Sequence, residues 1–467
     1  MNPLPRSTPE AEGLTSIQIN NFIADIAEMG KAGISQEVHS YMILRHGKVV
    51  GEGSFAPYQI ETPHVLFSVS KSFTSMAIGI AQAEGLLHVD DLVSRYLSED
   101  FPKEVSPYLA KLTLRHCLTM ATGHQTDSLD AIRGSTKRWV KAVLKHPFDH
   151  EPGTRFIYNT GATYLLSAVI QKITGITLLE YLKPRLFEPL GITEAKWQLS
   201  PEGISTGGFG LSVSVESIAK LGQLLLQNGV WEGRQLIDPK WIADATSKQI
   251  ENGDDPENDW TQGYGYQFWR CTFDAYRADG AFGQFIVVLP KEDMVVAINS
   301  GADDMGLILK KVWKHLLPNQ ATEPVLPAVE CSYPPQVGMG FDHGINLDGS
   351  TFDLKRPHPL FSQVTFNAVD DRNLELVITK DGCTQPLRVG YGQWITQLIQ
   401  TGEDIERLAV SGAWTKENEL TVLVRYIETP YVGRMTFTFK KDTFALDHYW
   451  NVVFWERKLT HYTGKKI

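Results

Sequence analysis

The sequence has few cysteines, no excess of basic residues and no long apolar run, and each absence narrows the range of functions. Its 467 residues include four cysteines and no C-x-x-C pair, so free thiols in a reducing compartment are expected rather than a disulfide framework. Asp and Glu (54) outnumber Lys and Arg (44), and the net charge of −10 argues against a nucleic-acid partner. No stretch of about 18 apolar residues occurs, so no membrane-spanning helix is expected.

The first residues, MNPLPRSTPEAEG, are polar and proline-rich and lack the basic flank and apolar core of a signal peptide. Two interpretations remain open: the protein is cytoplasmic, or the sequence is the mature form without its leader. We expect a cytoplasmic protein. The composition, 42% hydrophobic and 21% charged, is ordinary for a globular chain, and the length predicts two to three domains.

Hydrophobic periodicity predicts a sheet-plus-helices domain over residues 1–320. Strand patterns near both of its ends enclose mostly helical segments, which indicates an inserted helical region. The expected strands are 41–50 (two strands around a turn), 264–270, 284–289 and 294–299. The expected helices are 15–30, 69–84, 161–174, 217–228 and 305–316.

A proline-rich segment without periodicity, residues 317–327, predicts a boundary between two domains. After it, several segments alternate with period two, as half-buried strands do: 374–379, 419–426, 434–439 and 444–450. Residues 328–467 are therefore predicted to form a small antiparallel β domain. Three roles remain open for it: covering an active site, mediating dimerisation, or stabilising its neighbour. The oligomeric state is equally open.

Ser68 and Lys71 stand three positions apart at the start of the apolar segment 69–84. On a helix this spacing puts both side chains on one face, and a helix N-terminus favours an alkoxide. Apolar neighbours penalise an ammonium and therefore lower the pKa of Lys71. Because a neutral amine beside a hydroxyl is a base for acyl transfer, the pair predicts Ser68 as nucleophile and Lys71 as general base.

The same Ser-x-x-Lys spacing arises by chance about once or twice in a chain of this length. Ser217 and Lys220 are a second example. Polar residues at helical spacing surround Lys220, and we interpret it as a solvated lysine. Only Lys71 lies in a segment with no polar face, which favours Ser68 as the nucleophile, but the spacing alone leaves the choice open.

Further stretches in collinear order extend this signal: 65–74, 85–92, 112–124, 152–166, 189–192, 207–208 and 280–284. With them, the chain resembles the serine β-lactamase-related family over about residues 5–317. That family includes class C β-lactamases, D-Ala-D-Ala carboxypeptidases, D-aminopeptidases and related esterases and amidases. The resemblance implies an α/β (α+β), β-lactamase-like domain, in which helices flank an antiparallel sheet that carries a helical insertion.

The family's second motif is Tyr-x-Asn, and Tyr158 matches its tyrosine. The resemblance implies that Tyr158 passes a proton between the nucleophile and the leaving group. The third position of the motif is Thr160 here, and an asparagine stands one residue earlier, at Asn159. Both residues are candidates for substrate binding, and the sequence leaves the choice between them open.

The third motif, a strand-borne Lys-Thr-Gly or His-x-Gly, falls on residues 278–280, so its cation is absent. Asp279 and Gly280 are the substrate-binding candidates at this motif. Arg277 is adjacent. Because side chains alternate along a strand, Arg277 is expected to point away from the direction of the missing cation.

The family's oxyanion hole uses backbone N–H groups, which would here be those of Ser68 and Ala281 and which do not depend on side-chain type. The resemblance therefore implies a serine hydrolase that forms an acyl-enzyme on a small ester, amide or peptide substrate. The alternative is a degenerate relative that binds a ligand or peptide without turnover, because two motifs are altered. We expect no cofactor and no metal, since His146 and His150 lack a third ligand at metal spacing.

Overall fold

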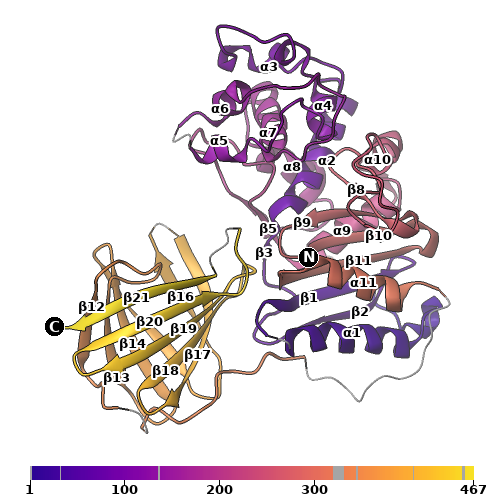
Figure 1. Cartoon of the computed structure of the whole chain (residues 1–467). Helices are drawn as coiled ribbons and strands as arrows, with labels where there is room; N and C mark the ends of the chain where they lie inside the picture. The colour runs from indigo at the N-terminus through magenta and orange to yellow at the C-terminus, as the bar shows by residue number, and fades with distance from the viewer. Residues whose placement is uncertain are drawn as a thin grey trace.

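The computed structural model shows an N-terminal domain of helices and strands beside a C-terminal domain made of strands (Figure 1). It describes residues 3–31, 33–134, 137–318, 331–342, 345–402, 404–454 and 458–467. The predicted domain boundary, 317–327, lies outside the described residues except for its first two positions, and it stays a prediction.

A six-stranded antiparallel sheet with strand order β2-β1-β11-β10-β9-β8 forms the centre of the N-terminal domain. Its strands are β1 (Gln36–Arg45), β2 (Lys48–Ser54), β8 (Trp269–Arg270), β9 (Tyr276–Gly280), β10 (Gln284–Leu289) and β11 (Met294–Ala302). The sheet thus joins segments from the two ends of the domain. This confirms the predicted fold class.

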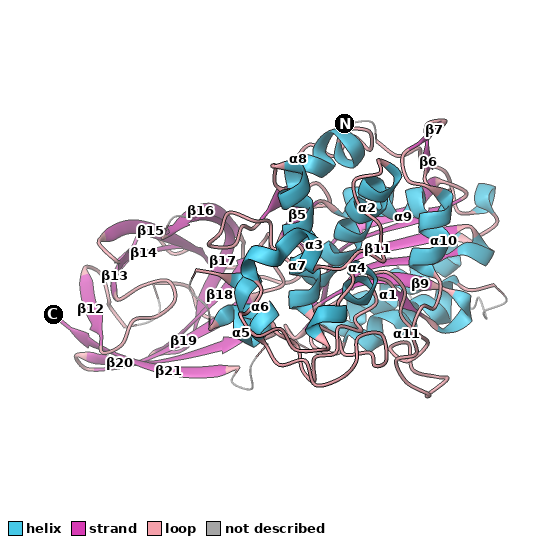
Figure 2. Cartoon of the chain, turned by 90° about the horizontal axis from the view of Figure 1, so that it is seen from above, coloured by secondary structure: helices cyan, strands magenta, loops and turns pink. Residues whose placement is uncertain are grey.

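The central strands are apolar on both sides because helices cover both faces of the sheet (Figure 2). One face packs against α1 (Ser16–Lys31) and α11 (Met305–Leu316), and the other against α2 (Ser70–Ala83) and α9 (Val215–Leu226). Neighbouring residues of β10 point to opposite faces: Val287 packs in the hydrophobic core on the α1 and α11 side, and Ile286 in the core on the α2 and α9 side. The result is a three-layered domain.

The region between β2 and β8 is mostly helical, as predicted for the insertion. Its remaining helices are α3 (Ser94–Leu97), α4 (Leu114–Leu118), α5 (Leu129–Arg133), α6 (Trp139–Lys145), α7 (Thr160–Thr174), α8 (Leu178–Leu182) and α10 (Pro239–Thr246). Its short strands are β3 (His64–Val65), β4 (Lys196–Trp197), β5 (Leu211–Val213), β6 (Val230–Trp231) and β7 (Arg234–Gln235). The helix α7 is buried along most of its length and forms the core of this region.

The C-terminal domain is a ten-stranded, predominantly antiparallel barrel, which confirms the predicted β domain. Its strands are β12 (Ser350–Leu354), β13 (Gln363–Ala368), β14 (Asn373–Lys380), β15 (Cys383–Gly390), β16 (Ile395–Thr401), β17 (Asp404–Lys416), β18 (Glu419–Tyr426), β19 (Val432–Lys440), β20 (Thr443–Trp450) and β21 (Leu459–Lys466). A parallel contact between Gly390 and Ser411 joins β15 to β17 and closes the barrel. Alternate side chains, such as Phe437 and Phe439 of β19, fill its interior.

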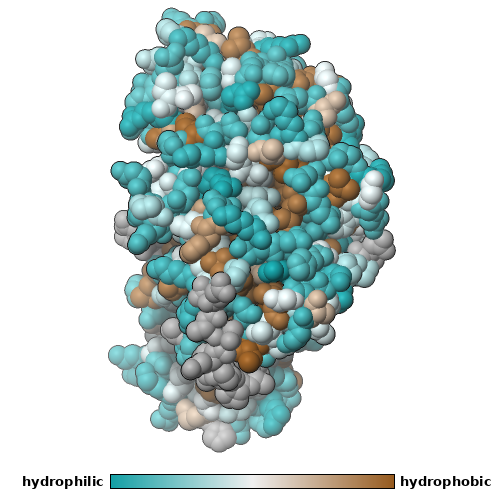
Figure 3. Space-filling view, turned by 90° about the vertical axis from the view of Figure 1, so that its right-hand side faces the viewer, coloured by the Kyte–Doolittle hydropathy of each residue, from teal (hydrophilic) through white to brown (hydrophobic). Residues whose placement is uncertain are grey.

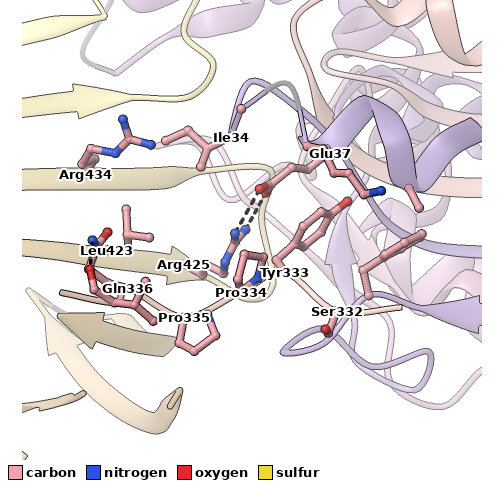
Figure 4. Close-up of a pocket in the computed structure, with 16 residues that line it drawn as sticks. Ile34, Glu37, Ser332, Tyr333, Pro334, Pro335, Gln336, Leu423, Arg425 and Arg434 are labelled. Carbon is pink, nitrogen blue, oxygen red and sulfur yellow. Dashed lines mark hydrogen bonds and ion pairs between the residues drawn. The ribbon is translucent and has the colours of Figure 1, made fainter. Parts of the chain in front are cut away.

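The two domains share a buried interface around an ion pair between Arg425 of β18 and Glu37 of β1 (Figure 4). Arg425 Nη2 donates to Glu37 Oε1 at 3.0 Å, and the guanidinium lies over the rings of Tyr333 and Trp394 at 4.8 and 5.0 Å. Ile427 of the barrel also belongs to the hydrophobic core beneath α1. The barrel is therefore packed firmly onto the N-terminal domain.

Two sequence predictions about the fold were wrong. The expected strand 264–270 is a strand only at its last two residues, because Gln267 has a φ of 69° and turns the chain. Lys220, interpreted as solvated, is 1% exposed. The N-terminal segment covers its side of α9, where the Leu4 N–H donates to Glu216 Oε1 at 2.8 Å.

The face of the molecule in Figure 3 carries small groups of hydrophobic residues separated by polar ones. Within the described ranges, no single helix is both long enough and apolar enough to cross a membrane. Among the described residues, one bent pair of helical segments, α7 and Leu178–Phe187, is long and apolar enough when the two are counted as one segment.

Candidate active site

Ser68 lies in a short 3-10 turn (Phe67–Val69) that leads directly into α2. Lys71 is in the first turn of α2, and its Nζ lies 3.0 Å from Ser68 Oγ. The same Nζ donates to the carbonyl oxygen of Gly208 at 2.7 Å and lies 3.4 Å from Thr160 Oγ1. Acceptors from two distant segments therefore hold the amine beside the serine hydroxyl.

The Lys71 side chain is 1% exposed, and the ring of Tyr158 packs against its amine. Burial lowers the pKa of its ammonium to about 7, and the carboxylates of Asp127 and Asp279 oppose this shift. This is the direction expected for a lysine in an apolar segment. An amine with a pKa near neutrality is partly unprotonated at pH 7, so it can accept a proton from a hydroxyl.

Tyr158 lies next to this pair. The Tyr158 ring is stacked on Trp269 with centroids 5.5 Å apart. Lys71 Nζ lies 4.9 Å from the centroid of the Tyr158 ring. Burial raises the pKa of the Tyr158 phenol, and a hydrogen bond with Ser68 opposes the rise. The phenol therefore stays protonated at neutral pH and can donate.

Asn159 and Thr160, the two substrate-binding candidates at the second motif, have different environments in the structure. Asn159 is completely buried and caps α7, because its Oδ1 accepts from the Gly161 N–H and from Ser128 Oγ. It is not among the residues that line the cavity beside Ser68, which corrects its assignment to substrate binding. Thr160 does line that cavity.

Asp127, which the sequence analysis missed, fixes Thr160. The carboxylate of Asp127 accepts from the Thr160 N–H at 2.7 Å and from Thr160 Oγ1 at 3.0 Å. Both residues line the cavity, and the charge of Asp127 acts on Lys71. No regular spacing connects Asp127 to the motifs, so a sequence pattern could not have singled it out.

At the third motif, β9 presents Asp279 to the cavity and turns Ala278 into the core on its opposite face. Arg277 lies on the Asp279 side of the strand and donates from Nε to Asp279 Oδ2 at 2.9 Å. Its guanidinium also lies 4.5 Å from the Trp260 ring. The register between β9 and β10 is regular, so no bulge carries Arg277 into the cavity. Its charge is matched by Asp279.

Gly280 allows the end of β9 to approach the segment before Ser68. A Cβ at this position would lie 2.3 Å from the Leu66 carbonyl oxygen, so no larger residue fits without a shift of the backbone. As a result, Ala281 and Ser68 line the same cavity. These are the two residues whose N–H groups the sequence analysis placed in an oxyanion hole.

The cavity has a volume of about 780 Å³ and is largely aromatic. Its aromatic lining residues are Phe67, Trp139, Tyr158, Phe209, Trp260, Trp269, Tyr431 and Phe454. Two of them, Tyr431 and Phe454, come from the barrel domain and were not expected from the sequence. Arg133 is the one cationic side chain among the described lining residues. In the described part of the chain, no cluster of three or more His, Cys, Asp or Glu residues is placed to hold a metal.

Among sequence relatives, a lovastatin esterase from Penicillium rubens is 27% identical over 180 residues, which are 32% of this chain and 45% of that protein. A putative D-alanyl-D-alanine carboxypeptidase from Escherichia coli O157:H7 is 24% identical over 214 residues, which are 41% of this chain and 49% of that protein. The chain thus spans about half the length of these two curated relatives.

Solved structures extend the comparison to the fold. An octameric penicillin-binding protein homologue from Pyrococcus abyssi has a TM-score of 0.52 and 18% identity, and the match covers 95% of this chain and 98% of that chain. EstCE1, a hydrolase with promiscuous acyltransferase activity, has a TM-score of 0.53 and 16% identity, covering 64% of this chain and 100% of that chain. A family model described as Beta-lactamase matches residues 26–305, more than half of the sequence. This chain therefore belongs to the beta-lactamase family.

Proposed function

We propose that this protein is a serine hydrolase that cleaves a small ester, amide or peptide bond through an acyl-enzyme. One observation carries the proposal: Lys71 Nζ lies 3.0 Å from Ser68 Oγ in a buried site that lowers the pKa of the lysine to about 7. The esterase and carboxypeptidase among the relatives support the same class of reaction.

In the proposed reaction, neutral Lys71 takes the proton of Ser68 as Oγ attacks the substrate carbonyl carbon. The N–H groups of Ser68 and Ala281 stabilise the negative oxygen that forms. Tyr158 passes the proton from Lys71 to the leaving oxygen or nitrogen as that bond breaks, which leaves an acyl-Ser68 ester. Water then attacks the ester, its proton returns through the same groups, and the released acid restores Ser68.

The direct test is covalent labelling with a fluorophosphonate, followed by mass spectrometry of the modified peptide. We expect a single phosphonylated site on the peptide that contains Ser68. The altered second and third motifs motivate the alternative, a protein that binds a ligand without turnover. That alternative predicts no time-dependent labelling, and a label on another serine would also refute the proposal.

The titration of Lys71 predicts the pH dependence of hydrolysis. Burial lowers the pKa of Lys71 to about 7, so the amine is charged and unable to accept a proton below that value. We therefore expect kcat/KM for a neutral ester to rise as the pH passes upward through about 7. Lys71→Ala should lower kcat by about 10²–10⁴-fold and remove this rise, without unfolding the protein.

Lys71→Arg is the matched control, since arginine keeps the charge but cannot be deprotonated in proteins. It should be as inactive as Lys71→Ala. An arginine variant with a normal rate would show that Lys71 acts through its charge, and full activity of Lys71→Ala would exclude it as the base.

The third motif predicts a preference for neutral esters over β-lactams. The carboxylate of a penicillin needs a cation beside the scissile amide, but Ala278 faces the core and Arg277 is paired with Asp279. A missing hydrogen bond to a charged group is worth about 1.5–3 kcal/mol, or one to two powers of ten in kcat/KM. Steady-state kinetics should therefore show p-nitrophenyl esters cleaved better than penicillins by at least about tenfold.

Two cations near the cavity allow this prediction to fail in a recognisable way. Efficient cephalosporin hydrolysis that is lost in Arg277→Ala would identify Arg277 as the anchor for the carboxylate. Loss in Arg133→Ala would assign that role to the arginine at the cavity wall instead. Either result would contradict a neutral substrate preference.

A further inference from the structure

The two residues next to the proposed oxyanion amides have an unusual backbone conformation. Phe67, which precedes Ser68, has a φ of 45°, and Phe282, which follows Ala281, has a φ of 65°. Bulky residues rarely adopt this left-handed region, and they remain there only where surrounding contacts force them to. Something must therefore hold both phenylalanines in place.

The contacts that hold them come partly from the barrel domain. The rings of Phe67 and Phe282 meet edge to face with centroids 5.6 Å apart. Phe454, which follows β20, lies 5.5 Å from Phe67 and 4.7 Å from Phe282. Tyr431, which precedes β19, lies 6.4 and 6.0 Å from the same two rings. We refer to these four residues as the four-ring cluster.

A backbone contact ties the same barrel loop to the segment before the nucleophile. The Val65 N–H in β3 donates to the Glu428 carbonyl oxygen at 2.8 Å. Glu428 and Tyr431 lie in the loop between β18 and β19, while Val65 stands two residues before Phe67. The barrel thus contacts this segment through both a hydrogen bond and aromatic rings.

We propose that Tyr431 and Phe454 are positioning residues of the active site. By packing on Phe67 and Phe282, they hold the left-handed backbone that directs the N–H groups of Ser68 and Ala281 toward one point in the cavity. The proposal rests on the proposed function, and it makes the barrel domain a working part of the hydrolase. Tyr431, about 360 positions after Ser68 in the sequence, then acts on the oxyanion hole to which the Ser68 N–H belongs.

The four-ring cluster is distinct from the two other buried contacts between the domains that were described above. The Glu37–Arg425 pair and the core around Ile427 lie at the domain interface and outside the cavity. Phe454 is 50% exposed, so its ring buries less area than a core phenylalanine and contributes less to stability. Truncating it should therefore disturb the oxyanion hole more than the fold.

The test compares Phe454→Ala, Tyr431→Ala and the double variant with wild type, using p-nitrophenyl acetate and a fluorophosphonate. Loss of one oxyanion donor costs about 10²–10³-fold in kcat, and a misdirected donor costs part of that. We expect kcat and the labelling rate to fall at least tenfold in the double variant, with KM changed less than threefold. The pH midpoint of the rate should not move, because Lys71 is untouched. Tyr431→Phe and Phe454→Tyr keep the rings and should retain the wild-type rate.

Leu398→Ala is the control, since Leu398 is an exposed barrel residue (58%) outside the cavity. It should match wild type in every assay. A double variant with unchanged kcat would overturn the proposal. So would a double variant in which only KM changes, since that result indicates a cavity wall and no effect on the oxyanion hole.

Amide hydrogen exchange gives a second readout that needs no turnover. In the double variant, peptides that contain residues 66–69 and 280–283 should exchange at least tenfold faster than in wild type, while peptides from α1 should not change. Unchanged exchange in the first two peptides would refute the role of the barrel even if the protein proves inactive. Failure of wild type to label at Ser68 would instead refute the proposed function, so the two failures are distinguishable.

Discussion

Replacing Ser68 with alanine is expected to abolish covalent labelling and to lower kcat by about 10,000-fold or more. Removing the nucleophile of a serine hydrolase leaves only the contributions of the oxyanion hole and of substrate binding. The fold should persist, because Ser68 is only partly buried and alanine fits the 3-10 turn before α2. Ester hydrolysis and fluorophosphonate labelling, with circular dichroism to check folding, measure the effect.

Ser217→Ala is the matched control because Ser217 stands in the second Ser-x-x-Lys sequence. Its hydroxyl donates to Glu194 Oε1 at 2.6 Å, and it is not among the residues that line the cavity. This variant should label and hydrolyse at close to the wild-type rate. An equal loss in both variants would mean that the nucleophile is wrongly assigned.

Local patterns predicted most of the architecture. The helix expected at 305–316 has those bounds in α11, and the alternating segments of the C-terminal half are strands of the barrel. Such patterns report which face of an element is apolar, but they do not report what covers a polar face. Lys220 was misjudged for that reason, since residues more than 200 positions away cover its side of α9.

The candidate site also contains a part that local spacing predicts and a part that depends on contacts between distant segments. Ser68 and Lys71 lie one helical turn apart, so their spacing alone brought them together. Lys71 also donates to the backbone carbonyl of Gly208, and a backbone acceptor cannot be recognised from residue types in a sequence. Asn159 did carry a usable signal: it stands two residues before the helix expected at 161–174, asparagine is a preferred N-cap residue, and the N-cap of α7 is its role.

Tyr431 and Phe454 could not be predicted, because nothing in the sequence says which loops of the barrel face its neighbour. Their place at the cavity depends on how the two domains pack. That packing in turn depends on buried interdomain contacts, which include the ion pair between Glu37 and Arg425 (Figure 4).

Replacing Arg425 with methionine is expected to lower the free energy of unfolding by about 3–5 kcal/mol. Methionine keeps much of the side-chain volume but leaves the carboxylate of Glu37, which is 1% exposed, without its partner. Burial already raises the pKa of Glu37, and the charge of Arg425 opposes that rise. Chemical denaturation followed by probes in each domain measures the loss.

The double variant Glu37→Met with Arg425→Met should be closer to wild type than Arg425→Met alone, because it removes both buried charges. Arg434→Met is the control, since Arg434 lines the same interdomain cavity but is exposed. It should change stability by less than about 0.5 kcal/mol. A double variant as unstable as the single one would show that packing dominates at this interface.

The pH dependence of the stability of Arg425→Met distinguishes an unpaired buried carboxylate at Glu37 from a loss of packing alone. In Arg425→Met the pKa of Glu37, which burial already raises, rises further, because the charge of Arg425 no longer opposes that rise. The folded state then binds the extra proton, so the stability of the variant must increase as the pH falls toward that raised pKa. We therefore expect its deficit against wild type to shrink between about pH 8 and pH 5. A deficit that stays constant over this range would mean that Glu37 is not left charged, and that the ion pair is not what holds the barrel in place.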